Sequence, residues 1–246
     1  MLGGTGFLGK VFLSLLLHRF PELGRVHLVV RPKGGLDSEA RFWAEIAPSQ
    51  VFDPLRAQHP GTAYEAFLRD KVHPIPGDVS KPFAGVPSDI RHHLRGKLSA
   101  LLNAAGVVDF NPPLDDALGV NAFGMQSLVA LARDLGDVPV LHTSTCYVAG
   151  NRTGQVDEVD PLSHPFPRAG TLEGSHWDPE LEIRECVDVV EHVRHRANDS
   201  FRQSAFLDEA KANLRDKGEP ERGTALEDEL ARVRRKYVEK ELARAG

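Results

Sequence analysis

The first residues with recognisable chemistry are three glycines near the start of the chain. The stretch GGTGFLG (3–9) places glycines at positions 3, 6 and 9. Backbone N–H groups reach a pyrophosphate only where side chains are absent, and the N-terminus of a following helix adds partial positive charge. Glycines are also common in ordinary turns, but here an amphipathic helix pattern follows directly, over residues 7–20. The sequence therefore predicts a dinucleotide-binding turn that leads into a helix.

Basic residues follow a short β-branched stretch, RVHLVV (25–30), which is predicted to be a strand. Arg31 and Lys33 stand where a carboxylate would favour NAD by binding the ribose 2′-hydroxyl. A guanidinium can instead bind the 2′-phosphate of NADP through two parallel hydrogen bonds. The alternative is an arginine on a solvated loop. Because the glycine turn lies about twenty residues earlier, the sequence favours NADP(H).

Two further predicted strands end in residues that suit a cofactor. Asp78, after the strand at 72–78, could hydrogen-bond the adenine amino group, or it could cap the turn. Ala104, Ala105 and Gly106, at the end of the strand at 98–106, would let backbone approach a cofactor. Small residues also suit any tight turn between a strand and a helix, so both interpretations stay open.

Hydroxyl groups end the strand predicted within residues 138–150. Ser144 and Thr145 lie in HTSTCY (142–147), at the carboxyl end of a parallel strand, where ligands bind in open α/β sheets. Such a hydroxyl could donate a hydrogen bond to a substrate carbonyl as it gains negative charge, or it could simply satisfy the strand end. Cys146 lacks a base paired with it in the sequence and is expected to be a small buried filler. The eleven histidines do not form a metal-binding pattern, so no metal site is predicted.

The elements that must position these residues alternate between strands and helices. Predicted helices at 7–20, 38–47, 54–69 and 113–133 separate the strands. This alternation predicts an α/β fold, a Rossmann-like doubly wound parallel sheet covered on both faces. We expect residues 1–150 to form the NAD(P)-binding domain.

The character of the chain changes after residue 150. Residues 151–170 are rich in turn formers and are expected to form a loop. Three charged helices are then predicted, at 179–198, 200–217 and 221–245, and the last carries an apolar stripe of Leu226, Leu230, Val233 and Tyr237. We therefore expect residues 151–246 to be a loop and a charged helical segment of the same protein.

Composition limits the functional class. The net charge of −5 over 246 residues argues against a nucleic-acid partner. Two distant cysteines form neither a disulfide framework nor a zinc pattern, which indicates a reducing compartment. The sequence has no apolar run of transmembrane length and no signal-peptide pattern, so a cytoplasmic location is expected.

Taken together, these segments resemble the amino-terminal part of bacterial-type fatty acyl-CoA reductases and related thioester reductases, which are extended short-chain dehydrogenase/reductases. The resemblance runs through four stretches: GGTGFLGKVFLSLLLHRFPELGRVHLVVRPK (3–33), PIPGDVSKP (74–82), LLNAAGVVDFNPPLDDALGVNAFG (101–124) and HTSTCYVAG (142–150). It implies an enzyme of lipid metabolism in which NADPH delivers hydride to the carbonyl of a fatty acyl thioester. A thiohemiacetal then collapses to an aldehyde and releases coenzyme A, and some members reduce the aldehyde to an alcohol. A lipid substrate is also compatible with peripheral membrane contact.

The resemblance also implies roles for single residues. The positions that match cofactor-binding residues of the family are Gly3, Thr5, Gly6, Phe7, Leu8, Gly9, Arg31, Lys33, Asp78, Val79, Ala104, Ala105 and Gly106. Thr145 best matches the catalytic hydroxyl, with Ser144 beside it, and Asn121 falls where many relatives brace the active site.

The sequence departs from the family pattern in two places. The family's general acid is a Tyr followed four residues later by Lys. Here the tyrosines and the residues four places later are Tyr64 and Leu68, Tyr147 and Asn151, and Tyr237 and Glu241. The first strand of the sheet is reduced to Met1-Leu2. We therefore expect an incomplete amino-terminal piece that catalyses poorly by itself.

Three alternatives remain open from the sequence. The first is a terminal reductase of a peptide or polyketide assembly line, which would accept a thioester on a carrier protein. The second is a non-catalytic NADP-binding or sensor protein. The third is a fragment from a truncated or mis-started reading frame, in which unpaired sheet edges would favour aggregation.

Overall fold

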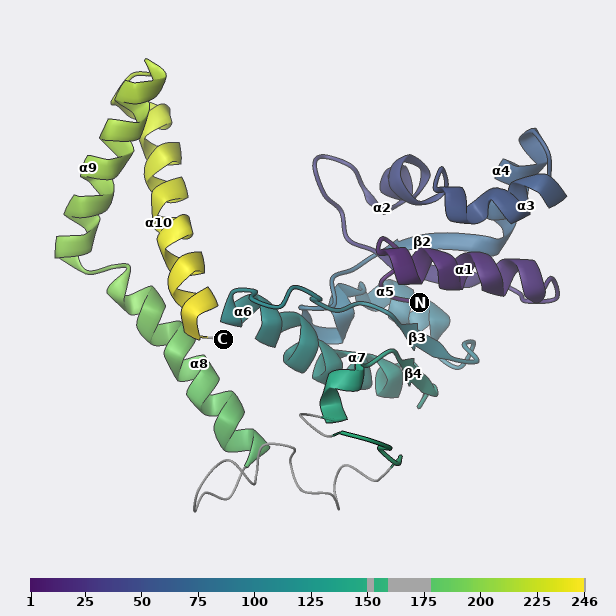
Figure 1. Ribbon diagram of the computed structural model, residues 1–246. Helices are drawn as coiled ribbons and strands as arrows, with labels where there is room; N and C mark the ends of the chain where they lie inside the picture. Colours follow the sequence, from purple (N-terminus) through teal and green to yellow (C-terminus); the bar gives the residue numbers. More distant parts are fainter. Residues whose placement is uncertain (150–152, 159–177, 246) are drawn as a thin grey trace. The chain divides into compact units, whose positions relative to one another are not determined.

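The computed structural model describes residues 1–149, 153–158 and 178–245, and these divide into two compact units (Figure 1). The first unit comprises residues 1–108 and 118–144, and the second comprises residues 109–117 and 145–246. Within the described residues, no helix is long and apolar enough to cross a membrane.

The first unit contains two pairs of parallel strands. Strand β1 (Val26–Val30) pairs with β2 (Val72–Pro76), and β3 (Leu101–Asn103) pairs with β4 (Val140–His142). All four are near the predicted positions, although β3 and β4 are shorter than the apolar runs that predicted them. The β-branched residues of β1 explain its extended backbone.

Met1 and Leu2 lie between the two strand pairs. The Met1 nitrogen donates to the carbonyl of His27 at 2.7 Å, and the Met1 carbonyl accepts from the Val29 N–H at 2.9 Å. Leu2 bonds in the same way to the other pair, donating to the Leu102 carbonyl at 2.8 Å. The strand order across the unit is therefore β2, β1, Met1–Leu2, β3, β4, and every described neighbour in it is parallel.

Helices cover both faces of this sheet. On one face, α1 (Phe7–Arg19), α3 (Asp53–Gln58) and α4 (Thr62–Lys71) pack on Val26, Leu28 and Val30 of β1. On the other face, α5 (Ser88–Leu94) and α7 (Phe123–Asp134) form a second apolar cluster that includes Leu2 and Leu101. Alternate residues of a strand point to opposite faces, so β1 serves both clusters. The fold is a Rossmann-like, doubly wound α/β sheet, as the sequence predicts.

Several helices begin or break differently from the prediction. The predicted helix at 38–47 consists of α2 (Ser38–Arg41) and a π-helix, η1 (Phe42–Ile46). Its N-cap is Asp37, which accepts from the Ala40 N–H, whereas Ser38 Oγ donates to the Val30 carbonyl. The helix predicted at 54–69 is two helices, α3 and α4, separated at Gly61, where φ is +65°. Short 3-10 turns occur at η2 (Gln50–Phe52) and η5 (Cys146–Ala149). The tight turn η3 (Pro82–Gly85) instead holds Phe83 and Ala84 at positive φ.

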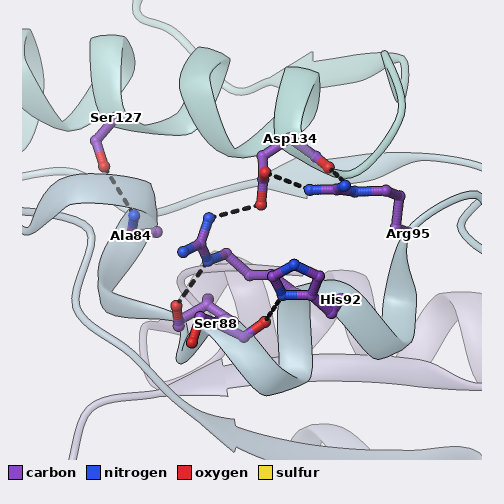
Figure 2. Close-up of polar contacts among 8 residues, drawn as sticks. Ala84, Ser88, His92, Arg95, Ser127 and Asp134 are labelled. Carbon is purple, nitrogen blue, oxygen red and sulfur yellow. Dashed lines mark hydrogen bonds and ion pairs between the residues drawn. The ribbon is translucent and has the colours of Figure 1, made fainter.

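The sequence pattern did not predict helix α5. Ion pairs connect this helix and the residue after it to α7 (Figure 2). The Asp134 carboxylate accepts from Arg91 and from Arg95, both at 2.6 Å. The Ser127 hydroxyl accepts from the Ala84 N–H at 2.7 Å, which fixes η3 against α7. Because residues on α5, η3 and α7 meet here, the second face of the sheet is closed by polar contacts as well as apolar ones.

The helix predicted at 113–133 is interrupted in its middle. It consists of α6 (Leu114–Ala117), a π-helix η4 (Leu118–Ala122) and α7. Short π-helical segments inside α-helices are frequent at functional sites. Asn121, one of the predicted site residues, lies in this segment.

The second unit is helical. Helices α8 (Pro179–Arg196), α9 (Ser200–Lys217) and α10 (Gly223–Ala245) match the three predicted helices closely. Asp178 caps α8, and Gly218 ends α9 in the left-handed conformation that favours glycine. Tyr237, Leu226 and Leu230 pack against a cluster that includes buried Phe206 and Val233, which confirms the predicted apolar stripe. The predicted loop at 151–170 lies mostly outside the described residues.

A buried carboxylate joins α9 and α10. Glu229 is 5% exposed and bonds to Asn213 and Lys217 of α9, each at 2.9 Å, and to Arg232 of α10. Hydrogen bonds from Arg232 and Lys217 lower the pKa of Glu229 to about 2.

We expect acid to loosen the pair of helices α9 and α10. A folded-state pKa of about 2 against an ordinary 4.5 means that the stabilisation is complete above pH 4.5 and is lost as pH falls toward 2. Hydrogen exchange of α9 and α10 amides should therefore accelerate over this range. Glu229→Gln should flatten the pH dependence, and Glu227→Gln, at an exposed position, should not. An unchanged slope in Glu229→Gln would contradict the assignment.

Candidate dinucleotide site

Two of the three glycines in and after the turn that follows Leu2 leave no room for a side chain. Gly3 has φ of +84°, and a Cβ there would lie 2.4 Å from the carbonyl carbon of Ala104. A Cβ on Gly9 would lie 2.1 Å from the Gly3 carbonyl oxygen. At Gly6 the nearest atom would be 3.5 Å away. The first and third glycines are therefore required by packing, whereas a Cβ at the second would make only an ordinary van der Waals contact.

The N-terminus of α1 presents free backbone donors. The first intrahelical bond runs from the Lys10 N–H to the Gly6 carbonyl at 3.1 Å. Among the described residues, no partner accepts from the N–H groups of Phe7, Leu8 or Gly9, and no side chain caps the helix. The first turn also carries no acidic residue. This end of α1 could therefore bind an anionic phosphate through both its donors and its dipole.

Side chains in this turn are exposed. Phe7 is 80% exposed, and Thr5 and Leu8 are exposed as well. An apolar side chain of this size is normally at least partly covered. These side chains could therefore cover a bound ligand.

Arg31 and Asp78 meet at the carboxyl ends of β1 and β2. The guanidinium of Arg31 lies 3.5 Å from the carboxylate of Asp78, with side-chain exposures of 59% and 23%. Burial alone would raise the pKa of Asp78, but hydrogen bonds from Ser80 and the charge of Arg31 together lower it. Asp78 is therefore a carboxylate that already has a cationic neighbour.

The other residues near this ion pair are held by backbone contacts. Arg41 donates to the Arg31 carbonyl at 2.7 Å, which fixes the end of β1. Lys33 is exposed and forms a short antiparallel bridge with Leu36. Val79 packs closely on Gly124 of α7, at 3.2 Å from the position of a Cβ. Val79 therefore contributes to packing between β2 and α7.

Asn103 organises the end of β3 and is absent from the set of predicted site residues. It is 2% exposed, and its side-chain oxygen accepts from the Ala105 N–H at 3.0 Å. Its amide nitrogen lies 3.0 Å from Nδ1 of His142 on β4. The signal available in the sequence was a polar residue at the end of an apolar strand. Asn103 thereby shapes the segment Ala104–Gly106, which packs against Gly3.

Asn121 holds the chain that follows this segment. Its side-chain oxygen accepts from the Val107 N–H at 2.9 Å, and its amide donates to the Val107 carbonyl at 3.0 Å. A Cβ on Gly106 would lie 3.5 Å from the same oxygen. Asn121 therefore acts as a positioning residue for backbone that lines the candidate site.

The hydroxyl residues after β4 fall at the boundary between the units. Ser144 is the last residue of this part of the first unit, and it is exposed. Thr145 belongs to the second unit, where its Oγ1 accepts from the Tyr147 N–H at 3.3 Å. Cys146 is exposed, so the expectation that it is a buried filler was wrong. Strand β4 ends at His142, and the Thr143 N–H still donates to the Asn103 carbonyl of β3 at 2.9 Å, so Ser144 and Thr145 lie just beyond the sheet.

The first unit thus brings together the glycine turn with Ala104 and Ala105, and Arg31 with Asp78. Within the described residues, no group of three or more His, Cys, Asp or Glu could hold a metal ion.

Comparison with known protein families identifies the family to which the first part of the chain is similar. The protein family described as NAD_binding_4, male sterility protein, matches residues 1–176. The chain belongs to this family. The family's NAD(P)-binding domain accounts for the glycine turn and for the parallel sheet.

Curated relatives of this family carry reductase names. The chain is 28% identical over 219 residues to "Probable fatty acyl-CoA reductase 4" of Arabidopsis thaliana, covering 88% of this chain and 42% of that protein. It is 32% identical over 158 residues to "Fatty acyl-CoA reductase 1" of Gallus gallus, covering 64% of this chain and 29% of that protein. The chain therefore spans less than half the length of these relatives.

One solved structure supports the fold. The terminal R domain from the myxalamid PKS-NRPS biosynthetic pathway superposes with a TM-score of 0.52 at 23% identity, covering 67% of this chain and 38% of that chain. At this identity the likeness concerns the fold alone.

Proposed function

We propose that this chain is the cofactor-binding part of an NADP(H)-dependent reductase that acts on fatty acyl-CoA thioesters. The observation that carries the proposal is the glycine turn, where Gly3 and Gly9 leave no room for a Cβ beside the free N–H groups of α1. Family membership and the names of the relatives support a reductase. When bound, NADPH would supply the hydride for reduction of the thioester carbonyl.

The proposal gives each residue of this site a role toward the dinucleotide. The N–H groups of Phe7, Leu8 and Gly9 would bind the pyrophosphate, with Thr5 and Gly6 at the same turn. Arg31, with Lys33, would bind the 2′-phosphate. Asp78 and Val79 would flank the adenine, and Ala104, Ala105 and Gly106 would line the path toward the nicotinamide.

We assign the substrate side to Thr145, with Ser144 beside it. An exposed hydroxyl can donate a hydrogen bond to a carbonyl oxygen as it gains negative charge. Within the second unit, Phe110 and Tyr147 contact each other edge to face, with ring centroids 5.8 Å apart, and both are exposed. Tyr147 donates its N–H to the Thr145 hydroxyl, so this aromatic pair would offer an apolar surface to an acyl tail near Thr145.

Discrimination between NADPH and NADH tests the cofactor assignment. Arg31→Ala should weaken NADPH binding by about tenfold or more, because charge-assisted hydrogen bonds to a phosphate contribute about 1.5–3 kcal/mol. NADH binding should stay unchanged. Arg25→Ala is the matched control, because Arg25 is an exposed arginine just before the same strand. Isothermal titration calorimetry with both cofactors measures the effect, and equal losses for NADPH and NADH would contradict the assignment.

A second experiment separates the candidate activities. The 246 residues contain no Tyr followed four places later by Lys, so we expect this chain to bind NADPH with little turnover. Turnover of palmitoyl-CoA by the chain at ordinary enzyme rates would contradict that expectation. Comparison of acyl-CoA with an acyl group on a carrier protein distinguishes the proposed substrate from that of an assembly-line reductase. A full-length protein that binds NADPH and reduces neither substrate would instead be a non-catalytic binding protein.

A further inference from the structure

A left-handed turn follows β2 and packs on α7. Phe83, Ala84 and Gly85 of η3 have φ values of 54°, 52° and 62°. This conformation favours glycine, and it costs free energy at Phe83 and Ala84 because their Cβ atoms crowd the backbone. Residues in such conformations persist only where the surrounding contacts hold them. The contacts of this turn therefore indicate what it positions.

The backbone of Ala84 connects α7 to Asp78. The Ala84 N–H donates to the Ser127 hydroxyl at 2.7 Å, as Figure 2 shows. The Ala84 carbonyl accepts from the Asp78 N–H, also at 2.7 Å. Ala84 is fully buried, so a bond to solvent cannot replace either of these bonds. Two hydrogen bonds in series therefore run from a side chain of α7 to Asp78, the residue proposed to flank the adenine.

Ser127 bonds to both ends of the segment 81–84. Besides accepting from Ala84, its hydroxyl donates to the Lys81 carbonyl. The Lys81 N–H in turn donates to the Asp78 carbonyl at 2.9 Å. A hydroxyl group has one O–H donor and two lone pairs, so it can serve both backbone groups at once. Alanine at position 127 would leave the buried N–H of Ala84 without its acceptor.

The turn is packed so closely on Asp78 that the two must move together. A Cβ on Gly77 would lie 2.6 Å from the Ala84 carbonyl oxygen. A Cβ on Gly85 would lie 2.8 Å from the Asp78 nitrogen. Close packing transmits displacements because no free volume absorbs them. Loss of the bond between α7 and Ala84 should therefore displace Asp78 as well.

The Asp78 carboxylate has one oxygen that is available to a ligand under the proposed function. The N–H and the hydroxyl of Ser80 donate to Oδ1 at 3.0 and 2.8 Å. The other oxygen, Oδ2, lies 3.5 Å from Arg31. If Arg31 binds the 2′-phosphate, Oδ2 becomes the acceptor for the adenine amino group, which can only donate.

We propose that Ser127 is a positioning residue for adenine recognition. Through Ala84 it holds the backbone of Asp78 where the Asp78 carboxylate accepts from the adenine amino group. Ser127 acts through the turn and not by contact with the cofactor. This inference rests on the proposed NADP(H) function, to which it adds a residue of α7.

The ratio of the affinities for NADPH and deamino-NADPH tests this role. Deamino-NADPH carries a carbonyl in place of the adenine amino group, so it cannot donate to Asp78. We expect the unmodified chain to bind NADPH about tenfold more tightly, because a hydrogen bond to a charged group is lost in the analogue. Ser127→Ala should reduce this ratio to about threefold or less. A general loss of stability would weaken both cofactors equally and leave the ratio unchanged.

Two further variants serve as controls, all measured by isothermal titration calorimetry. Ser127→Thr keeps the hydroxyl and should keep the tenfold ratio. Ser88→Ala removes the hydroxyl of an exposed serine on α5, just after the same turn, and should also keep it. A tenfold ratio retained in Ser127→Ala would overturn the role of Ser127 and leave the NADP(H) assignment intact. A ratio near one in the unmodified chain would overturn the proposal as well.

Amide hydrogen exchange without cofactor tests the hydrogen-bonded connection by itself. In Ser127→Ala, the N–H groups of Ala84 and Asp78 should both exchange at least about tenfold faster, whereas those of β1 should not change. Faster exchange at Ala84 alone would overturn the proposal, because Asp78 would then be held independently of α7. Absence of NADPH binding by the unmodified chain would instead overturn the proposed function, and the adenine role with it.

Discussion

Gly9→Ala should unfold the first unit more easily, whereas Gly6→Ala should leave its stability unchanged and weaken NADPH binding. A Cβ on Gly9 would overlap the Gly3 carbonyl oxygen at 2.1 Å, and backbone must then move. Overpacking of this kind destabilises by about 1–3 kcal/mol or somewhat more. At Gly6 the nearest atom is 3.5 Å away, so a methyl group fits. It would nevertheless occupy space that a phosphate needs beside the N-terminus of α1.

Urea unfolding and NADPH titration of both variants measure these effects. Gly24→Ala is the control, because nothing lies within 4 Å of a Cβ at that position. If Gly6→Ala bound NADPH as tightly as the unmodified chain, a phosphate site at this turn would be excluded. If Gly9→Ala were as stable as Gly24→Ala, the close approach of Gly9 and Gly3 would be wrong.

Acidification through the ordinary pKa of histidine, 6.5, should destabilise the first unit through His27 on β1. Burial and the charge of His73 lower the pKa of His27 in the folded chain. Between this lowered pKa and 6.5, the unfolded chain therefore binds a proton that the folded chain excludes. The free energy of unfolding rises with pH over this window, and this contribution becomes constant below the lowered pKa of His27.

Replacement of His27 isolates this contribution. His27→Gln removes the titrating side chain and should flatten the pH dependence, whereas His18→Gln, at an exposed position on α1, should not. Hydrogen exchange of β1 amides as a function of pH measures both variants. Identical slopes for His27→Gln and the unmodified chain would show that His27 does not contribute.

The fold was predictable where local signals agree with packing. The β-branched run before Arg31 predicts β1, and Gly218 predicts the end of α9, because each residue type imposes its own backbone geometry. The glycine turn could also be predicted from the sequence, because the spacing of its glycines reflects the close approach of backbone segments. That Gly3 is essential for packing could not be predicted, because its contact is with Ala104, about a hundred residues away in sequence.

The features of the structure that the sequence did not predict depend mostly on contacts between residues far apart in the chain. The pattern of apolar residues does not distinguish a π-helix from an α-helix, so η4 and the placement of Asn121 could not be predicted. The hydrogen bonds of Asn103 to Ala105 and His142 depend on the pairing of β3 with β4. The ion pair of Arg31 and Asp78 likewise depends on the adjacency of β1 and β2. Each was visible in the sequence only as a polar residue at a strand end.

That ion pair has a consequence for the evolution of cofactor choice. An exposed pair of this kind contributes about 0–1 kcal/mol, so under the proposed function a 2′-phosphate would take Arg31 from Asp78 at small cost. The carboxylate that remains beside it would then repel the phosphate, and selectivity would be the difference between these two effects. If Arg31 binds the phosphate as proposed, a lineage could strengthen its preference for the phosphorylated cofactor by neutralising Asp78 alone, with the basic residue unchanged.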